Sequence, residues 1–394
     1  MNLIGCPSCN TNNRLAFFEL NNMPTMDGKL SNNLKEAFSV PLGNIHLAYC
    51  KFCGYSENIS HEPEKISFEE YDFSVFHSPT FAQYLDQIIS RLILKHRLTN
   101  KTILELGSGD GYFLRDLCKK GGNKGIGIDP GFDHKDVNQT DYSVRFLQEH
   151  YSGQHADLKP DFIFCRHVLN AVPDPISFLK LIRKNIENNP DCTIYIEVPN
   201  AHYTFGQSVL WNVAYEHKSW YTPASLALML KVCGFEILDV YTCWKDEFLA
   251  IEARPGAISV KEDDFLFEFD ILQLGREIRK FQKEVAKIKE KNIVKINELD
   301  KKGIKAVMWG AGARGLTFLN MFKLKDTVQS VVDINPLRQG KFMPGTGHQV
   351  ISPEQLKEIE PELIIINNPT YEKEIKQHVY ELGLTCDFWV LNQT

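Results

Sequence analysis

The chain has 394 residues, more than one ordinary hydrophobic core holds, so its length predicts two or three domains. Its apolar and charged fractions are those of a globular protein, and its apolar runs fall short of the roughly 20 residues that span a bilayer. The formal net charge of −6 argues against a nucleic acid as the main partner, so we expect neither a nucleic-acid nor a membrane partner.

The N-terminal stretch, residues 1–75, begins without the basic and apolar regions of a signal peptide, so we expect a cytoplasmic protein. It carries two Cys-x-x-Cys pairs, Cys6 with Cys9 and Cys50 with Cys53. Four thiolates complete the tetrahedral coordination that zinc prefers and leave no open position for a substrate. The spacing therefore predicts a structural zinc module. A redox-active pair is the alternative, although redox chemistry needs only one pair.

Residues 76–258 alternate between strand-like and helix-like segments, which is typical of a mainly parallel sheet covered on both faces. A helix over residues 85–94 leads into the first strand. Strands are predicted at residues 102–106, 125–129, 161–165, 193–198, 236–241 and 248–253.

A glycine-rich turn, residues 103–111 (Ile-Leu-Glu-Leu-Gly-Ser-Gly-Asp-Gly), follows the first of these strands and opens a helix. Glycines let the backbone turn sharply and admit a ligand against bare amide groups. Asp129 ends the next strand, where its carboxylate can accept both hydroxyls of a ribose. No Lys-Ser/Thr follows the glycines, which excludes a P-loop, whereas a Rossmann-like oxidoreductase remains an alternative.

The stretch from this turn through residue 254 resembles the class I S-adenosylmethionine (SAM)-dependent methyltransferases. Residues 166–175 look like the His-Val-Leu-Glu-His-Val-Pro-Asp-Pro segment of many of these enzymes, with Asn170 and Ala171 in place of the Glu-His pair. The resemblance implies SAM as cofactor, with contacts from Glu105, Gly107, Gly109, Asp110, Asp129, Arg166 and His167.

A loop rich in aromatic and ionisable side chains, residues 211–223, follows the strand predicted at 193–198, where substrate-facing loops emerge in this fold. His217 is the only side chain there whose ordinary pKa suits it to accept a proton near neutrality, and Glu216 or another acceptor can orient it. The predicted catalytic residues are His217, Glu216 and Tyr215. Substrate contacts are predicted at Tyr71, Asn170, His202 and Tyr221.

Residues 259–302 are predicted to form one long, amphipathic connecting helix. Six apolar residues recur there in steps of three and four: Ile271, Leu274, Ile278, Phe281, Val285 and Ile288. A helix packed along its own chain is the first interpretation and a dimerising coiled coil the second. We therefore expect a monomer or a homodimer.

Strand–helix alternation restarts in residues 303–394 and predicts a second, smaller open α/β sheet. A turn with the pattern Gly-Ala-Gly-Ala-Arg-Gly (310–315) joins a strand to a helix, and a nucleotide phosphate can bind at the start of such a helix. The predicted substrate contacts are Gly310, Gly312, Arg314 and Asp333. The alternative is an empty lobe that only supports the cofactor domain.

Together the three parts resemble the nucleotide-sugar C-methyltransferases of deoxysugar biosynthesis. The C-terminal part carries the most specific match, over residues 307–315, 331–341, 344–347 and 368–369. The resemblance implies a Rossmann-like SAM domain, an N-terminal zinc module and a second, C-terminal Rossmann-like domain. It also implies a nucleotide-linked sugar as acceptor and a histidine that removes a proton beside a ketone.

The sequence departs from that family at the reacting end. Glu216 and His217 match the last two positions of the family's Tyr-His-Glu-His loop, but Ala214 and Tyr215 replace the first two, and Ala171 aligns with a further histidine. We predict methyl transfer from SAM to a nucleotide-linked sugar or related activated saccharide, with His217 as general base. O- or N-methylation of a related metabolite and a non-catalytic scaffold that binds SAM and nucleotide remain alternatives.

Overall fold

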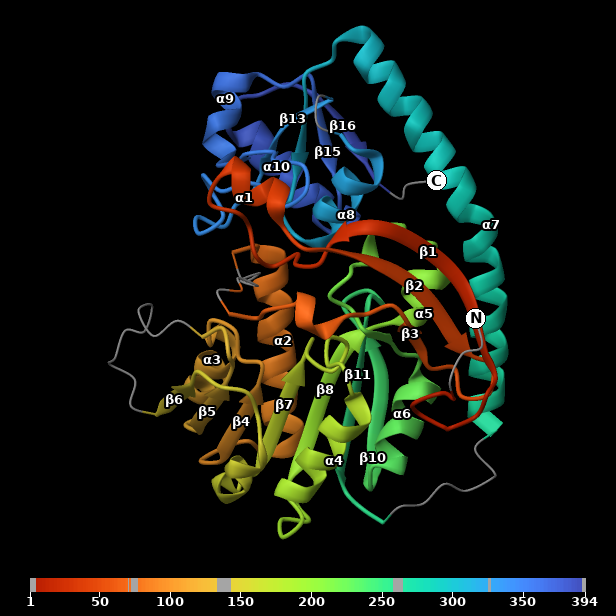
Figure 1. Cartoon of the computed structure of the whole chain (residues 1–394). Helices are drawn as coiled ribbons and strands as arrows, with labels where there is room; N and C mark the ends of the chain where they lie inside the picture. The colour runs from red at the N-terminus through yellow and green to blue at the C-terminus, as the bar shows by residue number, and fades with distance from the viewer. Residues whose placement is uncertain are drawn as a thin grey trace.

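Three β-sheets, tied together by one long helix, make up the molecule (Figure 1). The computed structural model describes residues 5–69, 71, 77–132, 143–257, 265–324 and 327–391. The seven-stranded sheet forms the lower half of the view, the five-stranded sheet the upper half, and the N-terminal sheet runs between them toward the long helix α7. None of the described helices is long and apolar enough to cross a membrane.

The N-terminal sheet has four antiparallel strands in the order β1-β2-β3-β9. Their bounds are β1 Arg14–Pro24, β2 Leu42–Cys50, β3 Ser56–Asn58 and β9 Ser219–Trp220, with helix α1 at Leu34–Ser39. The fourth strand comes from the loop that carries the predicted catalytic residues. The N-terminal sheet is therefore completed by a segment more than 150 residues further along the chain, since β9 pairs with β3.

The central sheet has the order β10-β11-β8-β7-β4-β5-β6. Neighbouring strands run parallel from β8 to β6, and β11 is antiparallel to both β8 and β10. The strands are β4 Thr102–Leu106, β5 Lys124–Ile128, β6 Val144–Leu147, β7 Phe162–Arg166, β8 Thr193–Pro199, β10 Phe235–Cys243 and β11 Phe248–Pro255. The short strand β6, which the sequence analysis did not predict, forms one edge of this sheet.

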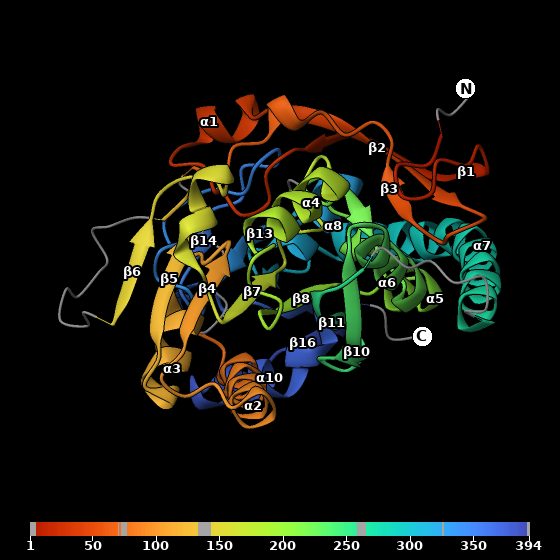
Figure 2. The same cartoon turned by 90° about the horizontal axis from the view of Figure 1, so that it is seen from below.

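Helices cover both faces of the central sheet because successive side chains of a strand point to opposite faces. Ile103 and Phe164 pack with helices α2 (Pro79–His96) and α3 (Tyr112–Gly121). Leu104 and Cys165 pack with α4 (Pro175–Asn185) and α6 (Pro223–Val232) on the other face. The view from below shows α2 and α3 on one side of the strands and α4 on the other (Figure 2).

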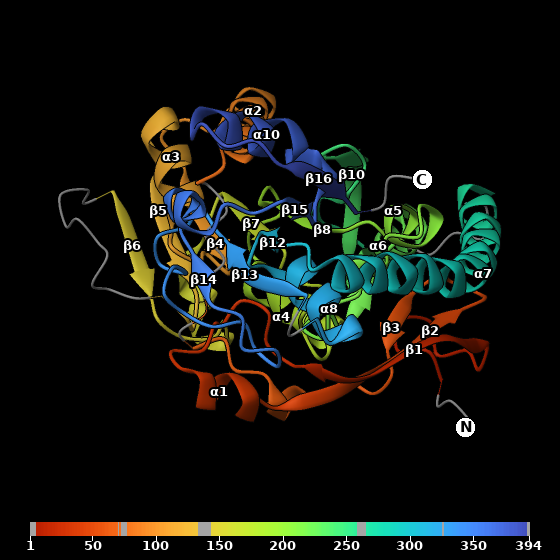
Figure 3. The ribbon, with the colours of Figure 1, turned by 90° about the horizontal axis from the view of Figure 1, so that it is seen from above.

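Helix α7, Phe265–Lys302, is 38 residues long and lies beside β1 and α5 (Ala201–Gly206), as the view from above shows (Figure 3). Its apolar stripe is buried at Leu274, Ile278 and Phe281. The ring of Phe281 lies 5.4 Å from that of Phe205 and 6.3 Å from that of Phe17. The helix thus buries this stripe against its own chain.

The C-terminal sheet has five parallel strands in the order β14-β13-β12-β15-β16. Its elements are β12 Ala306–Trp309, α8 Ala313–Phe322, β13 Val328–Val332, β14 Val350–Ile351, α9 Leu356–Ile359, β15 Leu363–Ile366, α10 Glu372–Glu381 and β16 Asp387–Val390. The two outer strands, β14 and β16, were not predicted from the sequence. Strand β14 has only two residues, and β16 begins with the exposed Asp387.

Backbone and side-chain hydrogen bonds join the three parts, among them those at the following two places. Ser31, next to α1, exchanges backbone hydrogen bonds of 2.8 and 2.9 Å with Phe342 of the C-terminal part. On the other side, Glu374 of α10 accepts from the hydroxyl of Ser78 at 2.8 Å and from the backbone N–H of Thr80 at 3.1 Å, at the start of α2. The C-terminal sheet is therefore held over the carboxyl ends of the central strands.

Candidate active site

One cavity of about 850 Å³ lies between the central and C-terminal parts. Segments from all three parts of the chain line it, among them the turn after β4, the segment after β7, the loop before β9 and the turn after β12. It is lined by fifteen of the predicted residues: Tyr71, Glu105, Gly107, Gly109, Asp110, Asp129, Arg166, His167, Asn170, Glu216, His217, Gly310, Gly312, Arg314 and Asp333. Residues predicted separately for cofactor, catalysis and substrate thus meet in one space.

The glycine-rich turn after β4 is shaped for close approach. Gly107 and Gly109 have φ values of +71° and +52°, and a Cβ at Gly107 would lie 2.1 Å from a methyl carbon of Val168. Asp129 fixes the turn, because its carboxylate accepts from the backbone N–H groups of Gly109 at 2.7 Å and Gly131 at 2.8 Å. Burial raises the pKa of Asp129, and these two hydrogen bonds oppose the rise.

Glu105 brings a buried carboxylate to the base of this turn. Only 2% of the residue is exposed, and burial raises its pKa to about 8 against the opposing charge of Arg166. Within the described part of the chain, its Oε2 atom and the hydroxyl of Ser108 have no hydrogen-bond partner. Buried polar atoms of this kind need partners, and the ammonium and hydroxyl groups of SAM fit them.

The segment after β7 is held by a carboxylate that the sequence analysis missed, Glu197 of β8. It accepts from Arg166 at 3.2 Å, from the hydroxyls of Tyr84 and Tyr195 at 2.7 Å each, and lies 2.9 Å from Nε2 of His167. Burial alone would raise its pKa, but Arg166 and His167 hold the pKa well below its usual range. A lone acid inside an apolar strand was the only sequence signal for this site. Glu197 fixes the two predicted cofactor residues at the cavity wall.

Asn170 and Ala171 stand in place of the Glu-His pair of the segment that residues 166–175 resemble. Both residues line the cavity, and Asn170 is 2% exposed with no hydrogen-bond partner for its Oδ1 atom among the described residues. The backbone carbonyl of Asn170 accepts from Ser219 of β9 at 2.9 Å. This contact connects the cofactor segment to the loop that carries His217.

His217 lines the cavity with its ring against Trp220, at 5.7 Å between ring centres. Burial lowers the pKa of His217, and the charge of Asp27 opposes this effect while that of His167 adds to it. Its Nδ1 atom is buried without a hydrogen-bond partner in the described part of the structure. The imidazole is therefore neutral near pH 7 and able to accept a proton.

Glu216 contacts the N-terminal segment rather than His217. Its carboxylate accepts from the backbone N–H groups of Asp27 and Gly28 and, at 2.6 Å, from the hydroxyl of Tyr71. Burial and the neighbouring carboxylate of Asp27 raise the pKa of Glu216. These contacts of Glu216 are with Asp27, Gly28 and Tyr71, and none of them is with the imidazole that it was predicted to orient.

Asp27 is a second carboxylate of the cavity that the sequence analysis missed. It is 5% exposed, lines the cavity, and its Oδ1 atom lies 3.4 Å from the hydroxyl of Tyr71. A single acid in a loop forms no pattern, so only the fold could place it beside Glu216, 189 residues away. The N-terminal segment therefore contributes directly to the cavity.

Tyr215 and Tyr221, two further predicted site residues, do not line the cavity. Tyr215 stacks on His61 at 5.6 Å between ring centres, and its hydroxyl accepts from the backbone N–H of Glu62 at 3.0 Å. Tyr221 is buried, and its hydroxyl lies 3.4 Å from the carbonyl oxygen of Leu169. Both side chains pack the loop against its neighbours.

His202 is likewise absent from the cavity wall. Its Nδ1 atom lies 2.6 Å from Glu277 and its Nε2 atom 2.5 Å from Asp270, both on α7. Burial alone would lower its pKa, but these two carboxylates raise it to about 9. The predicted substrate contact is instead an ion cluster that fastens α5 to α7.

The turn after β12 repeats the arrangement seen after β4. Gly310 has a φ of +107°, and the carboxylate of Asp333 accepts from the backbone N–H groups of Ala311 at 2.8 Å and Asn335 at 2.9 Å. Asp129 makes the equivalent pair of bonds in the central sheet. The C-terminal part thus keeps the geometry of a nucleotide-binding turn.

Arg314 lies at this turn and forms an ion pair with a carboxylate of the central part. Its Nη2 atom is 2.5 Å from a carboxylate oxygen of Glu247, which follows β10 in the central part and was also missed from the sequence. Arg338, another missed residue, lines the cavity close to Gly312, with its Nη1 atom 3.6 Å from Asp333. Two arginines therefore border the turn, and one of them is paired across the two parts.

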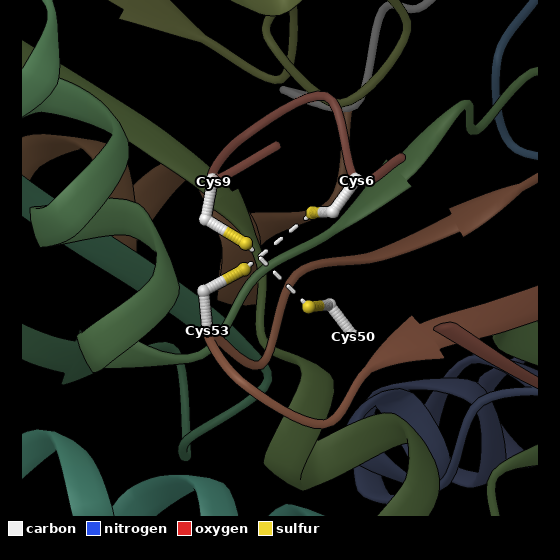
Figure 4. Close-up of side chains that lie close together, drawn as sticks. All are labelled: Cys6, Cys9, Cys50 and Cys53. Atoms are coloured by element: carbon white, nitrogen blue, oxygen red, sulfur yellow. Dashed lines mark hydrogen bonds between the residues drawn. The ribbon is translucent and has the colours of Figure 1, made fainter. Parts of the chain in front are cut away.

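The four N-terminal cysteines form a compact cluster (Figure 4). Their sulfur atoms lie within 4.8 Å of one another, at 3.6 Å between Cys6 and Cys53 and 3.6 Å between Cys9 and Cys50. A tetrahedral ion with Zn–S bonds of about 2.3 Å separates its sulfurs by about 3.8 Å. The cluster thus has the donor set and the spacing of a closed tetrahedral metal site.

Comparison with known protein families agrees with this architecture. Residues 78–240 match the model of a methyltransferase domain, and residues 271–385 match that of a C-methyltransferase C-terminal domain. The C-methyltransferase NovU of Streptomyces niveus is 21% identical over 389 residues, which cover 94% of this chain and 90% of the relative.

Two further similar proteins match smaller shares of the chain. A ubiquinone biosynthesis O-methyltransferase of Hydrogenovibrio crunogenus is 25% identical over 35% of this chain and 63% of its own length. Among solved structures, a SAM-dependent methyltransferase from Aquifex aeolicus covers 45% of this chain and 94% of its own, with 18% identity and a TM-score of 0.35.

The sheet order, the glycine-rich turn with its acid after β5, and the matching domain model together define a class I SAM-dependent methyltransferase. The C-terminal match and the relative that spans nearly the whole chain are more specific. The chain resembles the three-domain C-methyltransferases over almost its entire length.

Proposed function

We propose that the protein transfers a methyl group from SAM to a nucleotide-linked sugar or a related activated saccharide. The observation that carries this proposal is the shared cavity, since the SAM-type turn, His217 and the nucleotide-type turn after β12 all line it. Its volume of about 850 Å³ is in the range of small-molecule and cofactor sites. The relative NovU is named a C-methyltransferase, which supports the same reaction class.

Each part of the chain has its own task in this proposal. Residues 1–75 form the zinc module, 76–258 the SAM domain, 259–302 the connecting segment, and 303–394 the domain that holds the nucleotide portion of the acceptor. The four-cysteine cluster would hold structural zinc, which its sulfur spacing supports. All four positions are occupied by thiolates, so such an ion takes no part in the chemistry.

The residues around the turn after β4 fit SAM, which supplies an electrophilic methyl group when bound. Asp129 would accept the ribose hydroxyls, and the unpaired Glu105 oxygen would accept from the ammonium group. Arg166 and His167, fixed by Glu197, would hold the wall beside the methyl donor. The C-terminal part lies over this edge of the sheet and would limit the access of water.

His217 would remove the proton from the acceptor atom that receives the methyl group. The low pKa of its buried imidazole keeps it unprotonated at neutral pH, and the carboxylate of Asp27 would stabilise the imidazolium that forms. If the acceptor is a carbon beside a ketone, the product of this step is an enolate. If the acceptor is a hydroxyl, no carbon acidity is needed. Ala171 at the cavity wall, where the related enzymes carry a histidine, keeps O-methylation as a second candidate.

The test is label transfer from radioactive SAM to a panel of nucleotide sugars, with wild-type protein and His217→Asn. We expect His217→Asn to lower kcat by about 10²–10⁴ while SAM affinity stays unchanged. The wild-type pH–rate profile should show an acidic limb that the variant lacks. His46→Asn is the matched control, since His46 lies on β2 outside the cavity wall.

Two results would lead away from this proposal. Near-normal kcat in His217→Asn would remove the histidine from its role. SAM binding without methyl transfer to any member of the panel would favour the scaffold interpretation. Incubation of a nucleotide-linked keto sugar, deuterated beside its carbonyl, with enzyme and demethylated SAM separates the chemistries, because exchange with water requires carbon deprotonation.

A further inference from the structure

The turn between β10 and β11 has an unusual backbone. Trp244, Lys245 and Asp246 have φ values of +50°, +56° and +66°, a left-handed conformation that residues with a side chain seldom adopt three times in succession. Asn200 holds the turn, since its amide group donates to the carbonyl of Asp246 at 2.9 Å and its backbone N–H to that of Glu247 at 2.9 Å. Strained backbone of this kind persists where the surrounding structure requires a particular side-chain position.

Glu247 follows directly after this turn, and its side chain pairs with Arg314, so the pair joins the central part to the C-terminal part. The distance between Oε1 and Nη2 is 2.5 Å, and the two side chains are only 10% and 9% exposed. The remaining Oε2 atom of Glu247 and Nη1 atom of Arg314 are buried without hydrogen-bond partners among the described residues. Both residues line the cavity.

A buried ion pair with two unsatisfied atoms is costly unless something else completes its hydrogen bonds. Here the unsatisfied atoms are one acceptor and one donor, on a pair whose charges cancel. A phosphate would gain from Arg314 but would meet the carboxylate of Glu247 beside it. A hydroxyl suits both atoms, because it donates and accepts at once.

The surroundings place the pair toward the methyl-transfer end of the cavity. Phe248, the residue after Glu247, has its ring 4.5 Å from that of His167 in the cofactor segment. Trp244 and Tyr371 line the same region, with ring centres 6.0 Å apart. Both Arg314 and Arg338 border the turn after β12, which suits the nucleotide's phosphates, and Arg338 is the arginine that lies near Asp333 of that turn, at 3.6 Å.

We propose that Glu247 and Arg314 together bind hydroxyl groups of the acceptor's sugar ring and thereby determine which saccharide the enzyme accepts. This inference rests on the proposed function and adds to it the residues that recognise the sugar. The two parts of the chain each supply one member of the pair, so the sugar site is complete only when the C-terminal part lies over the central sheet.

The test is calorimetric binding to the protein saturated with demethylated SAM, using UDP-glucose, GDP-mannose and dTDP-glucose and the three free diphosphates. We expect at least one nucleotide sugar to bind more tightly than its own diphosphate. Glu247→Gln should weaken the binding of that nucleotide sugar by roughly 10- to 100-fold, as expected for the loss of hydrogen bonds to a charged group. The affinity for the free diphosphate should not change.

Matched variants separate recognition from structure. Glu236→Gln, on the same hairpin in a surface pair with Arg254, should change nothing. Because Glu247→Gln leaves Arg314 buried without its partner, the double variant Arg314→Met with Glu247→Leu replaces the pair by apolar groups. It should fold with unchanged SAM affinity and lose the preference for nucleotide sugar over diphosphate.

Two outcomes would overturn the inference while leaving the proposed function standing. One is that Glu247→Gln loses as much affinity for the free diphosphate as for the nucleotide sugar. The other is that the double variant keeps the wild-type preference for nucleotide sugar over free diphosphate. Glu247 and Arg314 would then only join the two domains. If the wild-type protein binds neither nucleotide sugars nor diphosphates, the proposed function itself fails.

Discussion

Replacing His202 by Asn should make the stability of the protein less dependent on pH. In the folded state Asp270 and Glu277 raise the pKa of His202 from an ordinary 6.5 to about 9. A group whose pKa is raised on folding stabilises the folded state below its unfolded pKa and loses this contribution as the pH rises through the folded value. At 1.36 kcal/mol per pH unit, the ion cluster contributes about 3 kcal/mol below pH 6.5, which disappears by pH 9 to 10.

The assay is urea unfolding followed by tryptophan fluorescence at pH 6.5, 8 and 9.5. The difference in unfolding free energy between wild type and His202→Asn should fall from about 3 kcal/mol to near zero over this range. His46→Asn is a matched control, because the ring of His46 contacts Asn21 and Ser60 and forms no ion pair within the described residues.

The reasoning would be refuted if the difference in unfolding free energy between wild type and His202→Asn stayed constant from pH 6.5 to 9.5. The pKa of His202 would then be the same in the folded and the unfolded protein. A second result would refute the placement. If His202→Asn lost acceptor binding at unchanged stability, the substrate contact predicted from the sequence would be right and the contact with α7 incidental.

Three further predictions concern the metal, the cofactor and the acceptor. Cys50→Ser should lower the zinc content from about one ion per chain and destabilise the fold, measured by metal analysis and thermal unfolding, because it opens a closed tetrahedral site; full zinc content would contradict this. Asp129→Ala should weaken SAM binding by roughly 2–3 kcal/mol in calorimetry, because a charged acceptor of two hydroxyls is lost; unchanged SAM affinity would contradict this. Gly312→Val should impair acceptor binding at unchanged SAM affinity, because a Cβ at Gly312 has its nearest neighbour, an atom of Arg338, at 3.7 Å and the side chain extends into the cavity. Gly153→Val, where a Cβ meets no atom within 4 Å, is the control. If Gly312→Val bound the acceptor as tightly as wild type, the C-terminal domain would be an empty support.

The features that the sequence predicted well depend on local pattern. The turn after β4 could be read from three glycines behind an apolar strand, and the acid at position 129 from its place at the end of the next strand. Helix α7 followed from a six-residue apolar repeat, and the observed helix, Phe265–Lys302, lies within the predicted segment 259–302. Such features are determined by residues close together in the chain, so their spacing is visible in it.

The carboxylates of the cavity could not be predicted in this way. Asp27, Glu197 and Glu247 are isolated acids in a loop, an apolar strand and a hairpin turn, and each owes its place to a distant partner. Asp27 meets Glu216 across 189 residues, and Glu247 meets Arg314 across 67. The same limit explains Tyr215 and His202, which looked like site residues because of their position in the chain but pack against His61 and α7.

Glu216 shows how the three parts depend on one another. Its carboxylate is held by the backbone of Asp27 and Gly28, and that segment is fixed on one side by β1, which pairs with the cysteine-bearing strand β2. On the other side, Ser31 is bonded to Phe342 of the C-terminal part. Since His217 is the next residue after Glu216, its position is set jointly by the N-terminal and C-terminal parts as well as by the SAM domain. The N-terminal sheet and the C-terminal sheet are thus both part of the structure that holds the candidate base.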